Sequence, residues 1–584
     1  MAALRSLTLN GTARAEDGVT SIPARYRPHL EAHEFIAEPA AGPEERIDVG
    51  VLFVGAGPAG LAGAIRLGQL LEHEPALRER LGEVPVAVLE KGKHPGAHLV
   101  SGAVINPIAF HRLFPDLKDA DLPFRAPVRG EALYVLTAGR AFRAPLLPPS
   151  MHNAGNFTAS LAEIGRWLGE RAEAAGAMLL SETTAQQVLV KDGAVLGVKT
   201  ADKGLGRDRE PLANFEPGVE VHAQATVLAE GVLSHLTAPL IERFGLCGVN
   251  PQIHALGVKE VWDVPGHSLD RIIHTMGWPL RVSRRYHEFG GGFIYPLGAD
   301  QISIGIVVGL DHADATLSVH DLLQEFKAHP LVRGILDGGT RNERGWGAKT
   351  IPEGGFFALP RRLGVRGALF TGDCAGFVNV PALKGTHYAM WSGILAAEAI
   401  VAALKGGEEA GSEAALAAYE RAVQDSFIWK DLYRVRNMRQ VFELGFAPGV
   451  ALAGMMAFSG GLVPGWRFGT AEDAAQPMFD GGRRYAKSDG ARTFDKLSSV
   501  YASGNRTRDT QPNHLRVLTD VPAEVGETWI HMCPAAVYEW GPAEGGKRAL
   551  RVNPPNCVQC GAITAKGGRF TPPEGGSGPE YTVT

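Results

Sequence analysis

"IDVGVLFVGAGPAGLAGAIRLGQLL", residues 47–71, is the stretch that decides the fold. An apolar run typical of a buried strand leads into the turn Gly55-Ala56-Gly57-Pro58-Ala59-Gly60, and small and apolar residues then continue as a helix. In this dinucleotide-binding pattern the first glycine allows a tight turn, the second lets the backbone approach a pyrophosphate, and the third lets helix and strand pack closely. Because the helix start offers unpaired N–H groups, we expect residues 55–60 to bind a dinucleotide.

A second predicted strand ends in an acidic residue suited to the same ligand. "VPVAVLEKG" (residues 84–92) ends its apolar run at Glu90, whose carboxylate can accept hydrogen bonds from ribose hydroxyls. The interval from Gly60 to Glu90 exceeds the usual spacing of about 20 residues. Residues 72–83 are therefore expected to form a longer helix or an excursion.

Two later segments decide between NAD and FAD. "ATVLAEG" (residues 225–231) is a predicted strand ending at Gly231, and "GALFTGDCAG" (residues 367–376) places Gly372 and Asp373 between a strand and a long apolar helix. An Asp at such a turn can bind a ribitol hydroxyl, and the helix start can stabilise the negative charge of a reduced flavin. NAD enzymes usually keep their cofactor unit contiguous, whereas these pieces are dispersed along the chain, so we predict FAD.

Two polar residues between that turn and the helix are expected to face the flavin. They are Asn379 and Thr386, in "GFVNVPALKGTH". A hydrogen bond from either side chain would adjust the midpoint potential of the flavin.

Length and composition describe a folded chain of several domains. Its 584 residues correspond to two to four domains of roughly 100–200 residues, and 45% hydrophobic and 21% charged residues are typical of globular proteins. The net charge of −5 gives no electrostatic reason to expect a nucleic-acid partner. Residues 1–45 contain no unbroken apolar segment and carry Glu16 and Asp17, so we interpret them as a polar extension without regular structure rather than a signal or transit peptide.

Several motifs occur in one order: "GAHLVSGAVINP" (96–107), "HTMGWPL" (274–280), "FGGGFIYPL" (289–297), "GFVNVPALKGTH" (376–387), "CPAAVYE" (533–539) and "PPEGGSGPEY" (572–581). Together they closely resemble the electron transfer flavoprotein–ubiquinone oxidoreductase family. The resemblance runs from about residue 47 to the C-terminus.

The resemblance implies an α/β fold, α+β overall. A Rossmann-like FAD domain is interleaved with a quinone-binding domain and followed by a ferredoxin-like iron–sulfur domain. The expected ranges are an N-terminal extension (1–45), the FAD domain (46–240 and 361–410), the quinone domain (241–360), a helical membrane-contacting segment (411–485) and the iron–sulfur domain (486–584).

The resemblance also implies a reaction and its partners. Electrons arrive from reduced electron transfer flavoprotein, pass through FAD and a [4Fe–4S] cluster, and reduce a membrane quinone, ubiquinone or menaquinone. The expected location is the cytoplasmic face of a bacterial inner membrane, with monotopic attachment.

The quinone site of the family falls on Gly290 and Gly291. Backbone N–H groups can reach a quinone carbonyl only where no Cβ intervenes. Read without the resemblance, the same glycines describe a flexible entry to a hairpin. The insertion "RVSRRYHE" (281–288) adds arginines beside this site, which could bind lipid phosphates or form a solvated loop.

The cluster site of the family has a fourth cysteine that this chain lacks. Cys533, Cys557 and Cys560 match three positions, the fourth falls on Ile563, and the loop that follows is shorter than expected. Since a [4Fe–4S] cube needs four ligands, three outcomes stay open: a cluster with a non-cysteine ligand or of the [3Fe–4S] form, an empty site, or a redox pair or zinc site that recruits His531. We favour an altered or three-thiolate cluster.

An uncharged segment is the candidate for membrane contact. Residues 444–466, "LGFAPGVALAGMMAFSGGLVPGW", are long enough to span a bilayer, but the prolines and Gly460-Gly461 interrupt a single helix. Arg434, Arg436 and Arg439 precede it as a basic flank. We expect a helix dipping into one leaflet, and the alternative is a buried core helix.

Two other functions compete with quinone reduction. A flavin-dependent reductase of isoprenoid lipids, of the geranylgeranyl reductase type, would share the glycine turn and an apolar pocket but would not need the C-terminal cysteines. A non-catalytic scaffold is supported only by Ile563, and the intact turn at residues 55–60 speaks against it.

Overall fold

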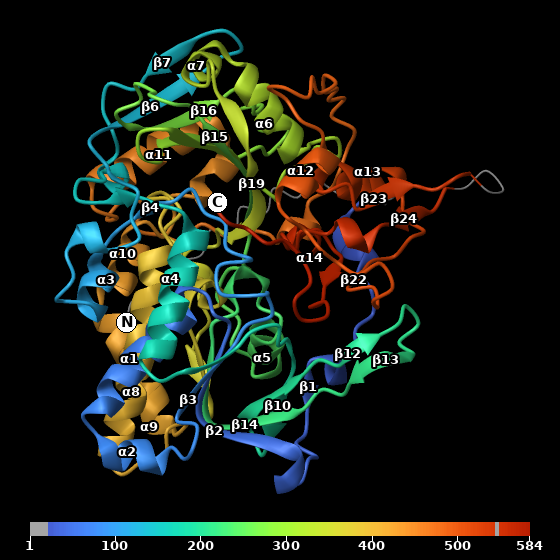
Figure 1. The fold of residues 1–584 in the computed structure, drawn as a ribbon. Helices are drawn as coiled ribbons and strands as arrows, with labels where there is room; N and C mark the ends of the chain where they lie inside the picture. The colour runs from blue at the N-terminus through green and yellow to red at the C-terminus, as the bar shows by residue number, and fades with distance from the viewer. Residues whose placement is uncertain (1–20, 544–547) are drawn as a thin grey trace.

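Two β-sheets organise the chain. The computed structural model describes residues 21–543 and 548–584, so residues 1–20 of the expected extension lie outside the described residues. One sheet carries the glycine-rich turn and the other carries Gly290 and Gly291, with helices and a small C-terminal domain around them (Figure 1). The predicted α/β class is confirmed.

The first sheet is nine-stranded and Rossmann-like. Its central strand β2 pairs in parallel with β3 on one side and with β14 on the other. Across the sheet the strands are β1 (Ile36–Ala37), β10 (Ala185–Lys191), β11 (Ala194–Thr200), β14 (Glu220–Leu228), β2 (Arg46–Val54), β3 (Val86–Leu89) and β9 (Met178–Leu180), with β21 (Ala368–Phe370) beside β14 and β20 (Gly364–Val365) beside β21.

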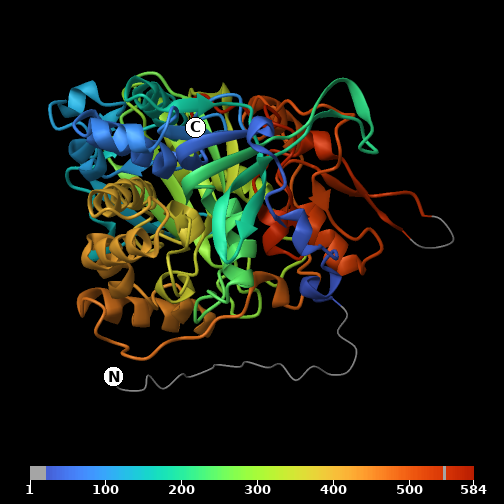
Figure 2. The ribbon, with the colours of Figure 1, turned by 90° about the horizontal axis from the view of Figure 1, so that it is seen from below.

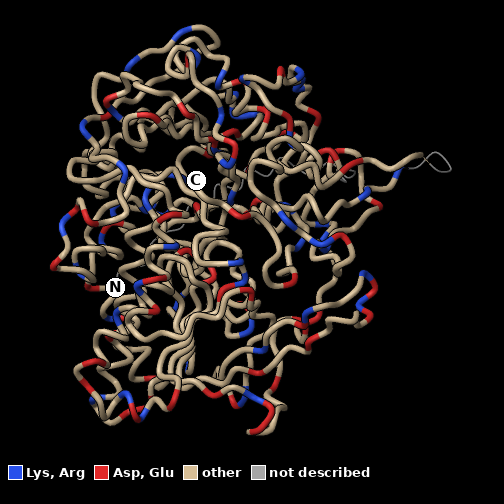
Figure 3. Tube along the Cα trace, in the orientation of Figure 1, with Lys and Arg blue, Asp and Glu red and all other residues tan. Residues whose placement is uncertain are grey.

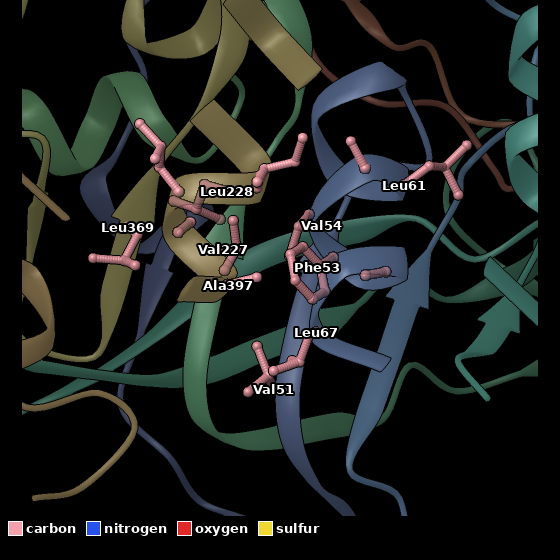
Figure 4. Close-up of a cluster of buried hydrophobic side chains, with 14 of the residues drawn as sticks. Val51, Phe53, Val54, Leu61, Leu67, Val227, Leu228, Leu369 and Ala397 are labelled. Atoms are coloured by element: carbon pink, nitrogen blue, oxygen red, sulfur yellow. The ribbon is translucent and has the colours of Figure 1, made fainter. Parts of the chain in front are cut away.

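The apolar run of the opening stretch is buried on both faces, as a central parallel strand requires. Phe53 and Val54 of β2 lie against Leu61 and Leu67 of helix α1 (Pro58–Glu72; Figure 4). Helix α8 (Thr386–Lys405) packs on α1 at a close backbone approach, since a Cβ on Gly393 would lie 2.0 Å from the Ala59 carbonyl oxygen. The long interval before Glu90 is explained by the length of α1 and by the short helix α2 (Pro75–Arg80) after it.

The second sheet is seven-stranded and faces the first. In order it contains β19 (Thr340–Pro352), β15 (His254–Asp263), β18 (Gln301–Gly309), β17 (Gly290–Pro296), β16 (Ile272–Gly277), β6 (Glu131–Leu136) and β7 (Ala141–Arg143). Because β6 and β7 precede residue 241, the chain enters this sheet once before the range expected for the quinone domain.

Helices cover the sheets and connect the smaller units. They are α1 (Pro58–Glu72), α2 (Pro75–Arg80), α3 (Ile108–Leu113), α4 (Leu161–Ala174), α5 (Thr237–Arg243), α6 (Val319–Ala328), α7 (Pro330–Ile335), α8 (Thr386–Lys405), α9 (Glu413–Asp425), α10 (Phe427–Arg434), α11 (Phe446–Phe458), α12 (Lys496–Ala502), α13 (Ala523–Met532) and α14 (Ala562–Ala565). Small pairings add β4 (Val104–Ile105), β5 (Ala126–Pro127) and β8 (Phe157–Thr158), β12 (Lys203–Leu205) with β13 (Pro211–Glu216), β22 (Leu515–Arg516) with β25 (Arg569–Phe570), and β23 (Tyr538–Trp540) with β24 (Leu550–Val552). Basic and acidic residues are interspersed along the trace (Figure 3).

Residues 21–45 have regular structure where none was expected. Ile36 of β1 pairs with Val188 of β10 and so adds an edge strand to the first sheet. Phe35 is buried, with its ring centroid 5.1 Å from that of His235. The short apolar segment around Phe35 supplies this contact, although the surrounding composition is polar.

The C-terminal residues return to the first sheet. Tyr581 donates its backbone N–H to the Ala97 carbonyl, and Ala162 donates its N–H to the Thr584 carbonyl. The end of the chain therefore lies among N-terminal and central segments in both views (Figures 1 and 2). This tail joins the small C-terminal domain to the rest of the molecule.

Candidate functional site

One cavity of about 780 Å³ joins the two sheets. Ten predicted residues line it: Gly55, Gly57, Pro58, Ala59, Glu90, Gly231, Asp373, Thr386, Gly290 and Gly291. Ala56, Gly60, Gly372, Asn379 and the three C-terminal cysteines are outside its lining. The structure thus brings together the expected nucleotide and quinone residues in one continuous space.

The glycine turn is shaped to receive a pyrophosphate. A Cβ on Gly57 would have its nearest neighbour at 4.0 Å, the Leu99 Cδ2 atom, so the protein leaves room there. Gly60, by contrast, is required by the fold, because its Cβ would lie 2.0 Å from the Gly55 carbonyl oxygen. The Glu90 carboxylate accepts hydrogen bonds from the backbone N–H of Ala56, at 3.1 Å, and of Gly92. Glu90 is thereby fixed at the cavity edge where a ribose would bind, and the turn fits FAD.

Of the two polar residues expected to face the flavin, Thr386 lines the cavity and Asn379 does not. Thr386 is the first residue of α8. Asp373 also lines the cavity. Burial raises the pKa of Asp373 to about 6, and the nearby Lys349 ammonium opposes that rise. The Asn379 amide instead bonds to the Tyr388 hydroxyl at 3.3 Å and accepts the backbone N–H of its own loop. Asn379 therefore holds the loop that presents Thr386.

The glycines at the quinone end lie within a strand, not in a flexible hairpin entry. A Cβ on Gly290 would lie 2.0 Å from the Val307 carbonyl oxygen, and one on Gly291 would lie 2.1 Å from the Thr275 carbonyl oxygen. Glycine is therefore required by the close packing of β17 against β18 and β16. The same lack of side chains exposes backbone to the cavity.

A buried pair of titratable side chains lies beside these glycines. His274 Nε2 and the Tyr295 hydroxyl are 2.6 Å apart, and both residues line the cavity. Burial lowers the pKa of His274 to about 3 and raises the pKa of Tyr295, so both groups are neutral at pH 7. Sequence reasoning did not link them, since they lie on different strands.

The three C-terminal thiols lie near one another: Cys533 and Cys557 are buried, Cys560 is half-buried, and Cys533 contributes to the raised pKa of both other thiols. The Gln559 N–H donates to the Cys557 sulfur at 3.4 Å, and the backbone N–H groups of Ala535 and Val537 at Cys533 and of Ala562 at Cys560 likewise act to lower the pKa of the thiol they follow. Burial raises the pKa of Cys560 to about 12 and that of Cys533 as well. Such sulfurs become thiolates only beside positive charge or metal.

The fourth ligand position of the family is filled by an apolar side chain. Ile563 is buried in the short helix α14, where its side chain packs against Gly568 and Val517. The hydroxyl of Tyr538 is buried close to all three thiols and has no hydrogen-bond partner in the described part of the chain. Three thiols with an unpaired donor fit an iron–sulfur cluster, but they do not fit one held by four cysteines.

His531 does not supply the missing ligand. It lies on helix α13, where its Nε2 atom is 3.3 Å from the Glu527 carboxylate. Across residues 21–543 and 548–584, no group of three His, Cys, Asp or Glu side chains is placed to hold a single metal ion. A zinc site with His531 is therefore not formed.

Comparison with known proteins decides the family. Residues 254–351 match the family model described as "ETF-QO, ubiquinone-binding", and residues 490–582 match "Electron transfer flavoprotein-ubiquinone oxidoreductase, 4Fe-4S". The mitochondrial electron transfer flavoprotein-ubiquinone oxidoreductase of Oryza sativa is 38% identical over 590 residues, which cover 97% of this chain and 99% of that protein. The Pseudomonas aeruginosa protein of the same name is 36% identical and covers 92% and 99%. The chain belongs to the electron transfer flavoprotein–ubiquinone oxidoreductase family.

Membership in the electron transfer flavoprotein–ubiquinone oxidoreductase family makes the chain an oxidoreductase, and FAD and an iron–sulfur cluster are its cofactors. A solved structure from Thermoplasma acidophilum, described as geranylgeranyl bacteriochlorophyll reductase-like, has a TM-score of 0.52 at 16% identity and covers 70% of this chain and 92% of its own. That likeness concerns the fold alone. The isoprenoid-lipid reductase alternative is therefore not favoured.

Proposed function

We propose that this oxidoreductase takes electrons from reduced electron transfer flavoprotein and delivers them to a membrane quinone. The observation that carries the proposal is the single cavity, which begins at the glycine turn, passes Gly290 and Gly291, and ends at helix α11. A cofactor and a quinone placed at its two ends would share one water-poor space. When bound, FAD supplies the electron-transfer chemistry.

At the nucleotide end, backbone N–H groups of residues 55–60 and the start of α1 would bind the pyrophosphate. Glu90 would accept from the ribose, and Asp373 from the ribitol chain. Gly231 has a φ of 68°, which lets the backbone turn away from the cavity after β14. These roles deepen the sequence prediction for each residue.

At the quinone end, Gly290 and Gly291 would present backbone N–H groups to a quinone carbonyl. Reduction of a quinone by two electrons also consumes two protons. The His274–Tyr295 pair holds an imidazole proton and a phenol proton inside the cavity at neutral pH. We assign this pair the role of orienting the quinone and relaying protons to its oxygens.

We further propose monotopic attachment to a membrane through α11. This helix has 13 residues and so is about 20 Å long, shorter than the roughly 30 Å hydrocarbon core. Phe458 and Leu462 are 70% and 78% exposed, and Met455 is exposed beside them. The helix Thr386–Lys405 passes the length and composition criteria for a span, but 83% of its apolar window is buried, so it belongs to the core.

The cavity opens at this apolar surface. Phe458 of α11 is exposed and also lines the cavity, as does the exposed Leu146. A quinone could thus enter from the hydrocarbon phase without crossing water. We propose the cytoplasmic face of a bacterial inner membrane as the location.

The basic flank differs from the one expected. Arg436 and Arg439 are buried, and Arg439 forms ion pairs with Asp311 and Glu353. Arg284, in the insertion, is exposed and lies next to the start of α11 at Gly445. Arg434 is exposed and its backbone lies against Gly461, just after α11, so Arg434 and the insertion are the basic groups placed for anionic headgroups.

The proposed function is tested by anaerobic mixing with reduced electron transfer flavoprotein and a short-chain quinone. We expect the bound flavin to be reduced and then reoxidised as quinol forms. Gly57→Ala should fold normally but retain less FAD and lose turnover, because its added methyl group occupies the pyrophosphate approach. Gly139→Ala, at an exposed glycine with open space around it, is the matched control.

Two results would contradict the proposal. One is FAD-loaded protein that reduced electron transfer flavoprotein cannot reduce. The other is turnover of a geranylgeranyl lipid with a nicotinamide donor, which would establish the isoprenoid reductase instead.

A further inference from the structure

We propose that Cys533, Cys557 and Cys560 hold a three-iron [3Fe–4S] cluster in place of the four-iron cube of the family. The inference concerns the iron–sulfur centre of the proposed electron path and rests on that function. It follows from what the three sulfurs have around them and from what the fourth position lacks.

The three sulfurs are equipped alike. Each is followed by backbone N–H groups that act to lower the pKa of its thiol. The N–H of Gln559, for example, lies 3.4 Å from the Cys557 sulfur. Hydrogen bonds of this kind stabilise the charged form of an acceptor more than the neutral form. The local backbone is therefore arranged for three thiolates.

Positive charge surrounds the same sulfurs. Lys91 donates to the Gln559 side chain, Lys349 donates to the Gln559 carbonyl at 3.1 Å, and Lys496 donates to the Ile530 carbonyl at 3.0 Å. All three lysines are half-buried, and their ammonium groups are bonded to amide oxygens. Each is also close enough to a cysteine to interact with it electrostatically. Partly desolvated cations are stabilised by nearby anions. Glu90, Asp373 and Asp321 supply part of that negative charge, and an anionic cluster would add to it directly beside the three sulfurs.

The fourth corner offers no ligand. Ile563 is only 5% exposed and has no polar atom in its side chain. A water or hydroxide on a fourth iron would need two to four polar partners to remain ordered in a buried site. His531 is paired with Glu527 instead. A cluster that needs only three protein ligands matches this set of residues, whereas a cube would lack a protein ligand for its fourth iron.

The sulfurs are also unsuited to a single ion. A lone zinc requires four ligands around one centre, and the described residues form no such group. A cluster spreads its ligands over several irons. Tyr538, whose buried hydroxyl lacks an acceptor among the described residues, has a donor available for an inorganic sulfide.

The test is a metal and spin count on anaerobically purified full-length protein. We expect three irons and four acid-labile sulfides per FAD. The oxidised protein should give a half-integer-spin EPR signal that is lost on one-electron reduction. Cys533→Ser, Cys557→Ser and Cys560→Ser should each lose most of the iron while keeping FAD. Cys247→Ser, at an exposed thiol remote from the site, should keep both and serves as the control.

Four irons per FAD, with EPR appearing only after reduction, would overturn the three-iron assignment. Protein that binds FAD but no iron would overturn it as well. Neither result depends on electron transfer flavoprotein or quinone. The turnover assay therefore tells a failed cluster assignment apart from a failed function. In that assay Gly57→Ala is the variant with lowered turnover and Gly139→Ala is its control.

Discussion

Thr386 faces the cavity whereas the Asn379 amide is bonded within its own loop, although both were expected to contact the flavin. Thr386→Ala should shift the flavin midpoint by roughly 10–30 mV, the equivalent of one hydrogen bond of about 0.5–1.5 kcal/mol in a two-electron couple. Asn379→Ala should lower the melting temperature and move the midpoint much less. A spectroelectrochemical titration measures both, and an unmoved midpoint in Thr386→Ala would contradict the assigned contact.

Lys259 makes the stability of the protein depend on pH. Burial lowers its pKa to about 7, and its ammonium donates to the Ser101 carbonyl at 2.7 Å. Between pH 7 and about 10 the unfolded chain binds a proton at this lysine that the folded chain does not, so the free energy of unfolding rises with pH. At ~1.4 kcal/mol per pKa unit, the effect is on the order of a few kcal/mol.

The comparison variant is Lys259→Met, measured by urea unfolding at several pH values. Wild-type protein should gain stability relative to this variant as the pH rises from 7 to 10. Lys191→Met, at an exposed lysine, should show a difference that is nearly constant with pH. A constant difference for Lys259→Met too would mean that its ammonium is not destabilised by burial.

The position of a single residue can be read from the sequence where spacing alone encodes the geometry. Gly55, Gly57 and Glu90 line the cavity because a strand–turn–helix places them there whatever surrounds it. The pairing of His274 with Tyr295 depends on the register of β16 and β17, which no local pattern specifies. His531 was offered as a zinc ligand from its closeness in sequence to Cys533, but it lies on a helix and pairs with Glu527 instead.

For helix α11, too, the local features were predictable from the sequence and the neighbours in space were not. The uncharged stretch was identified, and its interruptions have physical causes: Pro448 is tolerated in the first turn of a helix, and Gly460 and Gly461 end it with φ values of 63° and 88°. Closeness in sequence did not identify the arginines that lie beside the helix on the surface. Arg439 is drawn inward by Asp311, far away in the chain.

Charging the exposed face of this element should release the protein from membranes. Met455 and Leu462 are exposed and lie outside the cavity lining, so Met455→Asp with Leu462→Asp should leave FAD content unchanged. Losing two buried apolar side chains, about 1.5–3 kcal/mol each, should weaken binding to anionic vesicles at least tenfold. Leu497→Asp, on exposed α12, is the control. Equal sedimentation of all three proteins would contradict the monotopic assignment.

At the scale of the whole molecule, one side chain joins three parts of the chain. Tyr581 is 1% exposed, donates its backbone N–H to Ala97, and accepts the Ala348 N–H of β19 at its hydroxyl. Tyr581→Ala should cost roughly 3–5 kcal/mol, as large core aromatics do. Calorimetry should show both sheets melting together at lower temperature, with Thr582→Ala close to wild type. Separate transitions would mean that the domains are energetically independent.

The interleaved order of the domains was available only from family resemblance. Strands β6 and β7 join the second sheet, and residues 21–45 add a strand to the first, because both depend on contacts between distant segments. Hydrophobic periodicity indicates which face of a helix or strand is buried, but not which element packs against that face. It therefore predicts elements better than it predicts their pairing.

The cavity wall includes Phe570 and Pro572, whereas the turn opposite them begins at Gly55. When the last strand of the first sheet has been synthesised, the residues that complete the cavity wall have not yet been added to the chain. The nascent chain consequently cannot enclose its flavin during synthesis, and capture of the nucleotide must wait for release. Pulse-labelled chains stalled before residue 570 would be apoprotein, and a cell short of riboflavin would accumulate full-length chains with an open pocket.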